Sequence, residues 1–425
     1  MKRTLLMLLG SVALALGPAL SVQAQSATEG EVSFIVFGDP AERAAFEGLV
    51  TAFEAKFPSI DVTLVHIPGQ NDYRRRLATD FASGTPADIT LINYRRYASF
   101  AAKGVLEPLG PYLEKSQVIK EADFYPEAMQ PFYWQGTLMC IPQNLSSLVV
   151  YYNKNLFDES GVAYPSDEWT WNDFLTTAKA LTKDTDGDGA VDQYGLGTEA
   201  SIFRLAPFIW QNGGDIVDDP DHPTRLMLDT PEASEAVRWF IALQTEHKVI
   251  PDAVQEAAED SESRFQNGRL AMFLNSRRGV PTYRDISAFD WDVAPLPQGK
   301  QKAGILHADA YCLSKLATNK DAAWTFIEFA NSVEGQTLVA ASGRTVPSLR
   351  SVAESPAFLD PNAKPSRSNV FLDSIPFIRG VPIMETWVDI ESTVGNELER
   401  GMFGHGSAED VIAESIRRTD EYFAP

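Results

Sequence analysis

The sequence predicts a two-lobed α/β protein whose lobes are assembled from discontinuous segments. Strand-like and helix-like stretches alternate from residue 32 onward, a pattern typical of parallel strands with crossover helices. The chain has 425 residues, which exceeds the roughly 250 to 300 residues at which a single core stops growing. No flexible linker divides it into two halves, so we expect several crossings between two lobes.

The first 24 residues have the three parts of a secretory signal peptide. Lys2 and Arg3 form a basic start, an apolar run follows over 5–16, and small residues stand at 22–24. The apolar run is too short to span a membrane, and no cysteine stands at the cleavage point to carry a lipid. We expect cleavage after Ala24 and release into the periplasm.

The first lobe begins with a predicted strand at 32–37 that ends at Gly38, Asp39 and Pro40. Apolar residues at helical spacing follow up to Pro58, and a strand returns at 60–65. A helix at 73–81 and a strand at 88–92 repeat the pattern. Ligands meet open α/β sheets at the carboxyl ends of strands, so the loops at 38–40 and 93–97 are the candidate binding loops.

The second lobe begins with an apolar strand at 145–152 and continues with helices at 171–181, 231–246 and 262–267. Strands at 291–293 and 305–313 lead back to an amphipathic helix at 321–331. The stretch at 347–360 is looser and marked by prolines, and a helical region ends the chain.

The formal net charge of −22 argues against nucleic acid and anionic lipid as partners. Arg74, Arg75 and Arg76 form a local basic run, but they open a helix after Asp72. We therefore expect them to form a solvated face.

Cys140 and Cys312 are the two cysteines, and both lie in short apolar strand-like runs. We interpret them as two buried thiols, with a disulfide as the alternative in an oxidising compartment. The five histidines lack the spacing of a helical zinc site, so metal catalysis has no support.

An acidic loop resembles the beginning of a calcium-binding loop. Asp184, Asp186 and Asp188 alternate with Gly187 and Gly189 along the chain, and Asp192 stands at the ninth position. The twelfth position, where a glutamate completes an EF-hand, is Gly195. We predict at most a weak, structural calcium site, with a solvated acidic turn as the alternative, and no other cofactor.

Short motifs spread over most of the chain resemble the family 1 extracellular solute-binding proteins, the maltose-binding-protein-like group. They are Gly84-Thr85-Pro86-Ala87-Asp88-Ile89, Lys103-Gly104-Val105-Leu106-Glu107-Pro108-Leu109, Tyr151-Tyr152-Asn153-Lys154, Trp169-Thr170-Trp171, Trp210-Gln211-Asn212-Gly213-Gly214, Gly268-Arg269-Leu270-Ala271-Met272 and Ala322-Ala323-Trp324-Thr325-Phe326. The resemblance implies hinges near 142–147, 306–309 and 372–379. It divides the chain into a first lobe of 25–143 plus about 309–375 and a second lobe of about 147–306 plus 378–425.

The resemblance also implies which residues surround the ligand. Motif by motif, these are Asp39, Asn93, Tyr94, Arg95, Arg96, Asn144, Ser146, Trp210, Asn275, Arg278, His307, Asp309 and Trp387. The helix before Asn212 also offers Phe203, and Arg344 is a weaker candidate for the cleft.

Two arginines depart from the maltose-binding pattern. Arg95 stands where that pattern has an acidic residue, and Arg278 where it has a tryptophan that stacks on sugar. A guanidinium suits carboxylate, phosphate or sulfonate, although it also donates to hydroxyls. We hypothesise a saccharide with an anionic group or a polyol phosphate as ligand, with a neutral sugar as the alternative.

Two classes of function follow. The first is a monomeric, non-enzymatic binding protein that closes its lobes over a solute and presents it to the membrane subunits of an ABC transporter. The second is a secreted carbohydrate-active hydrolase with Asp39 and Asp309 as paired carboxylates. No nucleophile elbow, phosphate loop or metal-binding helix supports the second class.

Overall fold

The computed structural model describes residues 29–423, so the expected signal peptide lies outside the described residues. One sheet forms the first lobe, with strands in the order β2-β1-β3-β13-β4 and with β7 also paired to β13. Its strands are β1 (Gly30–Phe37), β2 (Ile60–Ile67), β3 (Ile89–Asn93), β4 (Leu106–Glu107), β7 (Cys140–Pro142) and β13 (Asp309–Ser314). β1 is parallel to β2 and β3, whereas β13 is antiparallel to its three neighbours.

Helices cover this sheet as the alternating pattern predicts. They include α1 (Pro40–Lys56), α2 (Gln70–Ser83), α3 (Tyr94–Ala102), α13 (Lys320–Ala330) and α14 (Val333–Ala341). The apolar face of α1 is buried through Phe46, Leu49 and Phe53, and Phe53 and Phe34 of β1 both contact Phe326 of α13. Segments almost 300 residues apart therefore share one core.

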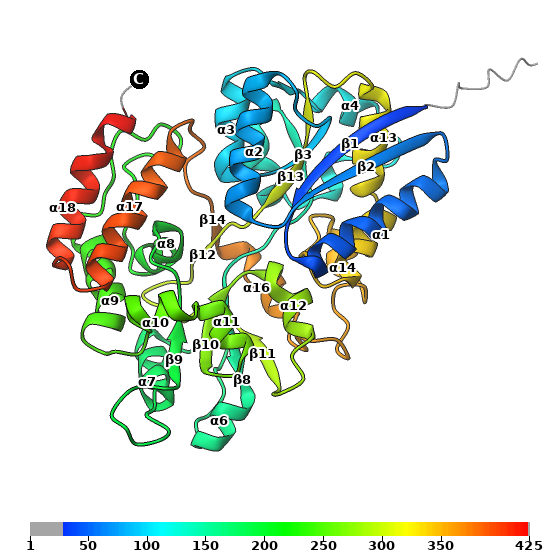
Figure 1. Cartoon of the computed structure of the whole chain (residues 1–425). Coiled ribbons are helices and arrows are strands. Elements are labelled where there is room, and N and C mark those ends of the chain that lie inside the picture. The colour runs from blue at the N-terminus through cyan, green and yellow to red at the C-terminus, as the bar shows by residue number, and fades with distance from the viewer. Residues whose placement is uncertain (1–28, 424–425) are drawn as a thin grey trace, which may run out of the picture.

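A four-stranded sheet in the order β11-β8-β10-β9 forms the second lobe. Its strands are β8 (Val149–Asn153), β9 (Tyr194–Gly197), β10 (Leu270–Asn275) and β11 (Trp291–Ala294). The helices around it include α6 (Lys154–Ser160), α7 (Trp171–Leu181), α8 (Ile202–Gln211), α9 (Pro231–Thr245), α10 (Ala253–Ala258), α11 (Ser261–Gln266), α12 (Val280–Arg284), α17 (Trp387–Met402) and α18 (Ala408–Thr419). Figure 1 shows the two lobes with thin connections between them. None of the described helices is long and apolar enough to span a bilayer.

The connections between the lobes run side by side. Ser146 and His307 exchange backbone hydrogen bonds of 2.8 Å in both directions. The short strand β12 (Gly304–Ile305) pairs in parallel with β14 (Ile378–Arg379), and both labels lie between the lobes in Figure 1. Because adjacent crossings are hydrogen-bonded, their loops meet at one place between the lobes.

The segment that begins with β13 departs from the expected division of the chain. The expected division places about 309–375 in the first lobe, but the part of this segment that packs in the first lobe ends near α15 (Arg350–Ala353). Phe358, Val370 and Phe371 pack with Tyr151 and Trp291 in the core of the second lobe. The proline-marked stretch has no apolar periodicity to indicate which sheet it covers, so its packing was not readable from the sequence.

The interpretation of the cysteines as free thiols is wrong. Cys140 and Cys312 form a disulfide with 4.5 Å between their Cα atoms. They lie directly opposite each other in the antiparallel pair of β7 and β13. This register joins residues 172 positions apart, and no local pattern in the sequence reports it.

We predict that replacing both cysteines with alanine lowers the free energy of unfolding by about 2 to 5 kcal/mol, because the disulfide restricts a long loop in the unfolded chain. Urea denaturation of the oxidised wild type and of the double variant measures the difference. Two reactive thiols in the urea-unfolded, unreduced wild type would contradict the disulfide itself.

Candidate functional site

A cavity of about 230 Å³ lies between the two lobes, where the crossings meet. Residues from both sheets and from the connections surround it. They are Phe37, Gln70, Arg74, Asn93, Arg95, Asn144, Ser146, Glu199, Ser201, Phe203, Arg204, Asn275, Ser276, Arg277, Arg278, His307, Asp309, Arg344, Val346 and Glu391. Polar and charged side chains predominate, so the cavity suits a polar solute.

Eight of the thirteen predicted ligand residues line this cavity: Asn93, Arg95, Asn144, Ser146, Asn275, Arg278, His307 and Asp309. They come from strand ends and crossings, the places where the resemblance put them. Their contact with a ligand stays a prediction.

The two predicted stacking tryptophans lie elsewhere. Trp387 is 0% exposed in the core of the second lobe. Trp210 is also buried, donates its indole N–H to Asp215 at 3.1 Å, and lies beneath the guanidinium of Arg379. Large aromatic side chains are usually buried for packing, and here both tryptophans are.

Asp39 does not line the cavity either, because its carboxylate begins helix α1. Oδ1 accepts from the backbone N–H of Glu42 at 2.9 Å, and the carboxylate of Glu42 accepts in return from the N–H of Asp39 at 3.1 Å. Oδ2 accepts from the hydroxyl of Thr282 in the second lobe. Asp39 therefore joins the two lobes beside the cavity.

Tyr94 and Arg96 are the other two predicted ligand residues that do not line the cavity. Tyr94 is fully buried, and its hydroxyl accepts from the backbone N–H of Val381 at 3.2 Å. Arg96 lies 3.5 Å from Glu391 and lines a neighbouring cavity. Because α3 begins at Tyr94, consecutive residues there point in different directions.

Sequence reasoning missed Arg74, Arg204, Glu199 and Glu391, all of which line the cavity. Arg74 was expected on a solvated face, but it lies one helical turn after Gln70, which also lines the cavity. The spacing of Tyr73 and Leu77, both buried, indicates the inner face of α2, and Arg74 borders that face. This spacing is the sequence signal that could have placed Arg74 near the cavity.

Arginines outnumber carboxylates around the cavity. Six arginines and three carboxylates line it, and Glu42 lies directly behind Arg278 and Arg344. Arg95 pairs with Glu391 at 2.5 Å and Arg204 with Glu199 at 3.2 Å. The neighbouring guanidinium of Arg204 is the main reason that the pKa of Glu199 lies below its ordinary value.

Arg74 has no carboxylate partner among residues 29–423; its guanidinium donates to the amide oxygens of Gln70 and Asn71 at 2.6 and 3.1 Å. Burial, and then repulsion from Arg95, lower the pKa of Arg74. Burial, and then Arg74, likewise lower the pKa of Arg96 to about 10. Glu42 and Glu262 pair with Arg278 on the other side of the cavity, whereas near α3 three guanidiniums crowd one carboxylate, Glu391, and Arg74 is left without an ion pair among the described residues.

His307 supplies a neutral group at the centre of the crossings. Its ring lies 4.5 Å from that of Phe203, and its Nε2 is buried without a hydrogen-bond partner in the described part of the chain. Burial, and then the charges of Arg204, Arg95 and Arg278, hold the pKa of His307 well below its ordinary value. A buried nitrogen without a partner is costly, so it is available to a ligand hydroxyl.

Asp309 is held in place by two amides. Its carboxylate accepts from Asn93 at 3.1 Å and from Asn144 at 3.4 Å, and its backbone N–H donates to Asn144 at 2.7 Å. Asp39, the other member of the imagined hydrolytic pair, is used as a helix cap and lobe contact. The two carboxylates therefore do not face a common substrate position in the cavity.

The acidic loop lies in the second lobe, away from the residues that line the cavity. Carboxylate oxygens of Asp184, Asp186 and Asp188 lie within 4.8 Å of one another and are exposed. Asp192 instead accepts from the backbone and side chain of Thr185, both at 2.8 Å. Calcium binding at this loop stays a prediction.

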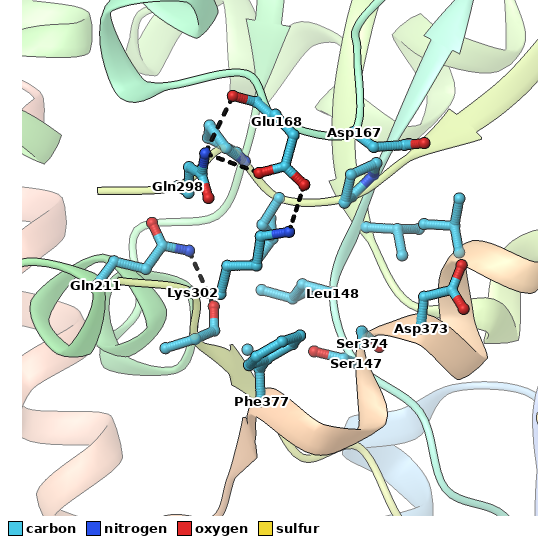
Figure 2. Close-up of a pocket in the computed structure, with 17 residues that line it drawn as sticks. Ser147, Leu148, Asp167, Glu168, Gln211, Gln298, Lys302, Asp373, Ser374 and Phe377 are labelled. Atoms are coloured by element: carbon cyan, nitrogen blue, oxygen red, sulfur yellow. Dashed lines mark hydrogen bonds and ion pairs between the residues drawn. The ribbon is translucent and has the colours of Figure 1, made fainter. Parts of the chain in front are cut away.

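A second cavity, of about 250 Å³, lies in the second lobe beside the crossings (Figure 2). Lys302 pairs there with Glu168 at 2.8 Å, and Gln211 donates to the backbone of Ala303 at 2.9 Å. None of the predicted ligand residues lines this cavity, and the sheet of the first lobe contributes nothing to it. We therefore assign the candidate site to the cavity between the lobes.

Residues 38–337 match the family model described as bacterial extracellular solute-binding protein. The chain belongs to this family, and it is a solute-binding protein of an ABC transporter rather than an enzyme. Membership implies a location outside the cytoplasmic membrane, a small-molecule ligand and transporter subunits as partners.

Named relatives and solved structures agree with this assignment. A putative binding protein of Brucella abortus is 24% identical over 412 residues, which cover 95% of this chain and 96% of that protein. The sn-glycerol-3-phosphate-binding periplasmic protein of Escherichia coli is 24% identical over 67% of this chain and 64% of that protein. The ABC substrate-binding protein from Listeria monocytogenes in complex with cycloalternan has a TM-score of 0.86 and 26% identity, and covers 93% of this chain and 99% of that one.

We predict that His307 makes the protein less stable in mild acid. The unfolded chain binds a proton near pH 6.5 while the folded chain does not, so stability is lost as the pH falls below that value. The contribution reaches about 1.4 kcal/mol per pH unit for one proton. Urea denaturation of wild type and His307→Asn between pH 7.5 and 5.5 measures it.

His222→Gln is the matched control, because the His222 side chain is 88% exposed. We expect this variant to follow the wild-type pH dependence and His307→Asn to show a shallower one. Equal slopes for all three proteins would show that His307 does not titrate as described.

Proposed function

We propose that this protein captures a small sugar or polyol bearing an anionic group in the periplasm and delivers it, as a monomer, to the membrane subunits of an ABC importer. The observation that carries the proposal is the excess of arginine over carboxylate around the cavity, centred on Arg74. A ligand anion would neutralise the repulsion that Arg74 and Arg95 exert on each other. The named relative that binds sn-glycerol 3-phosphate is a polyol phosphate binder.

Besides its charged groups, the cavity offers polar groups that can bind the hydroxyls of a ligand. Asn275, Ser146 and Asp309 offer amide, hydroxyl and carboxylate groups to the same cavity, and His307 offers an unpaired nitrogen. A sugar or polyol presents several hydroxyls that both donate and accept, which suits such a mixed set. The ligand is therefore a polyhydroxylated anion rather than a simple inorganic one.

Closure of the lobes provides the mechanism of capture. Residues of the first lobe, the second lobe and the crossings all border the cavity. A ligand that contacts both lobes at once binds the closed form better than the open one, and shifts the population by that difference in affinity. The closed form then offers the membrane subunits a surface shared between the lobes.

We predict that anionic sugars stabilise the mature protein and that Arg74→Gln abolishes the effect. A thermal-shift screen with uronates, sugar phosphates, polyol phosphates and their neutral parents identifies the ligand, and calorimetry measures its affinity. Loss of a buried ion pair to the ligand should weaken binding by about 2 to 5 kcal/mol. Binding of a neutral parent should change little.

Arg75→Gln is the matched control, since Arg75 is the next residue on the same helix and its side chain is 74% exposed. We expect wild-type affinity from this variant. Stabilisation of the wild type by neutral sugars alone, with no effect of Arg74→Gln, would contradict the anionic ligand. Stabilisation by none of these compounds would contradict sugar capture.

A further inference from the structure

We propose that the cavity accepts a ligand of one sugar residue and excludes its longer oligomers, because contacts between the lobes close one end of the cavity and narrow the other. The inference rests on the proposed function and specifies the length of the solute. It is drawn from four side-chain contacts between the lobes and from the volume of the cavity.

Arg95 blocks the first end. From α3 in the first lobe, its Nη1 lies 2.5 Å from Glu391 on α17 in the second lobe. Its guanidinium also lies 3.7 Å from the ring centroid of Phe203 on α8. The side chains of Arg95 and Glu391 are only 11% and 15% exposed, so they fill this end rather than bridge it through solvent.

Arg278, whose side chain is 37% exposed, narrows the opposite end. From the loop after β10 in the second lobe, its Nη1 lies 3.4 Å from the buried carboxylate of Glu42 on α1. Beside it, the hydroxyl of Thr282 on α12 donates to Asp39. In Figure 1 the α1–α12 contact and the α3–α17 contact lie on opposite sides of the crossing strands β12 and β14.

The volume of the cavity is small for this kind of site. At about 230 Å³, the cavity lies below the roughly 300 to 1,000 Å³ of pockets that hold drug-sized ligands. A single sugar or short polyol matches such a volume, whereas a trisaccharide needs a groove that continues past one end. The ligand length therefore depends on whether either end opens.

A neighbouring cavity shows where a longer ligand would have to go. It has a volume of about 350 Å³ and shares Arg74, Asn93 and Arg95 with the central cavity. Beyond Arg95 its walls are more apolar and include Leu77, Phe100 and Val388. Phe37 and Gln70 also line both cavities, and the Arg95 side chain, held by Glu391 and Phe203, forms part of the boundary between the two spaces.

The test compares matched ligands of one and three residues on the wild-type protein. Calorimetry measures galacturonate against trigalacturonate, and galactose and glucose against galactotriose and maltotriose. We expect binding by a single-residue member and affinity at least about tenfold weaker for its trimer. A trimer that binds as tightly as its monomer, or more tightly, overturns the inference while leaving sugar capture intact. Binding of none of these sugars, together with no stabilisation by the sugar phosphates and polyol phosphates of the thermal-shift screen, overturns the proposed function as well.

A double variant without two of the groups that contact Arg95 tests whether this side chain closes the first end of the cavity. In Glu391→Ala/Phe203→Ala, Arg95 loses its ion pair and its aromatic contact and keeps the hydrogen bond from its Nε to Asn93 Oδ1 at 3.2 Å, so its guanidinium can turn away from the boundary between the two cavities. We expect the affinity for the trimer to rise by about tenfold or more relative to wild type. Unchanged exclusion of the trimer by the folded double variant would show that Arg95 does not separate the cavities.

Glu391→Gln is the matched control for this variant. Its side chain keeps the volume of glutamate and an oxygen that accepts from Arg95, so exclusion of the trimer should persist. Thermal unfolding establishes that each variant is folded. The comparison of monomer with trimer on the wild type decides the inference even where the double variant does not fold.

Discussion

The closed arrangement of this protein depends on one buried carboxylate. Glu42 is 0% exposed and lies between Arg344, whose Nε is 3.2 Å away, and Arg278 of the second lobe. An ionised group buried without partners costs several kcal/mol, so both guanidiniums are needed where Glu42 lies. Gly38 provides the space: its φ is +136°, and a Cβ there would lie 2.5 Å from the carboxylate of Glu42.

This carboxylate also determines what Asp39 does. Glu42 and Asp39 form the capping box that begins α1, and this holds the Asp39 carboxylate toward Thr282 rather than into the cavity. The Asp39 side chain, which the resemblance placed among the ligand residues, thereby makes a contact between the lobes. The cavity lining therefore lacks this carboxylate, whereas Arg95 and Arg278 belong to it.

The sequence predicted the features that local patterns encode. Alternating strands and helices located both lobes and the loop at 93–97, and the resemblance to the solute-binding family located eight lining residues, including Asn93 and Asp309. It did not predict features that depend on partners distant in the chain. The Cys140–Cys312 bond depends on the register of two strands, and the burial of Trp387 depends on the packing of helices around it. Arg74 was missed because a basic run in an acidic chain resembles a solvated helix face.

An acidic protein with an arginine-rich cavity is not a contradiction, because the two charges act over different distances. The formal charge of −22 belongs to the whole chain, and exposed charges are screened beyond about 8 Å at physiological ionic strength. Arg74 and its neighbours act inside a cavity where partial burial weakens that screening. While the lobes are apart, water solvates these guanidiniums, and closing the lobes removes it. If the ligand carries the proposed anionic group, that group replaces this lost solvation, whereas a neutral ligand leaves the repulsion between Arg74 and Arg95 in place. On the proposed function, selection for charge would therefore occur as the lobes close rather than on first encounter.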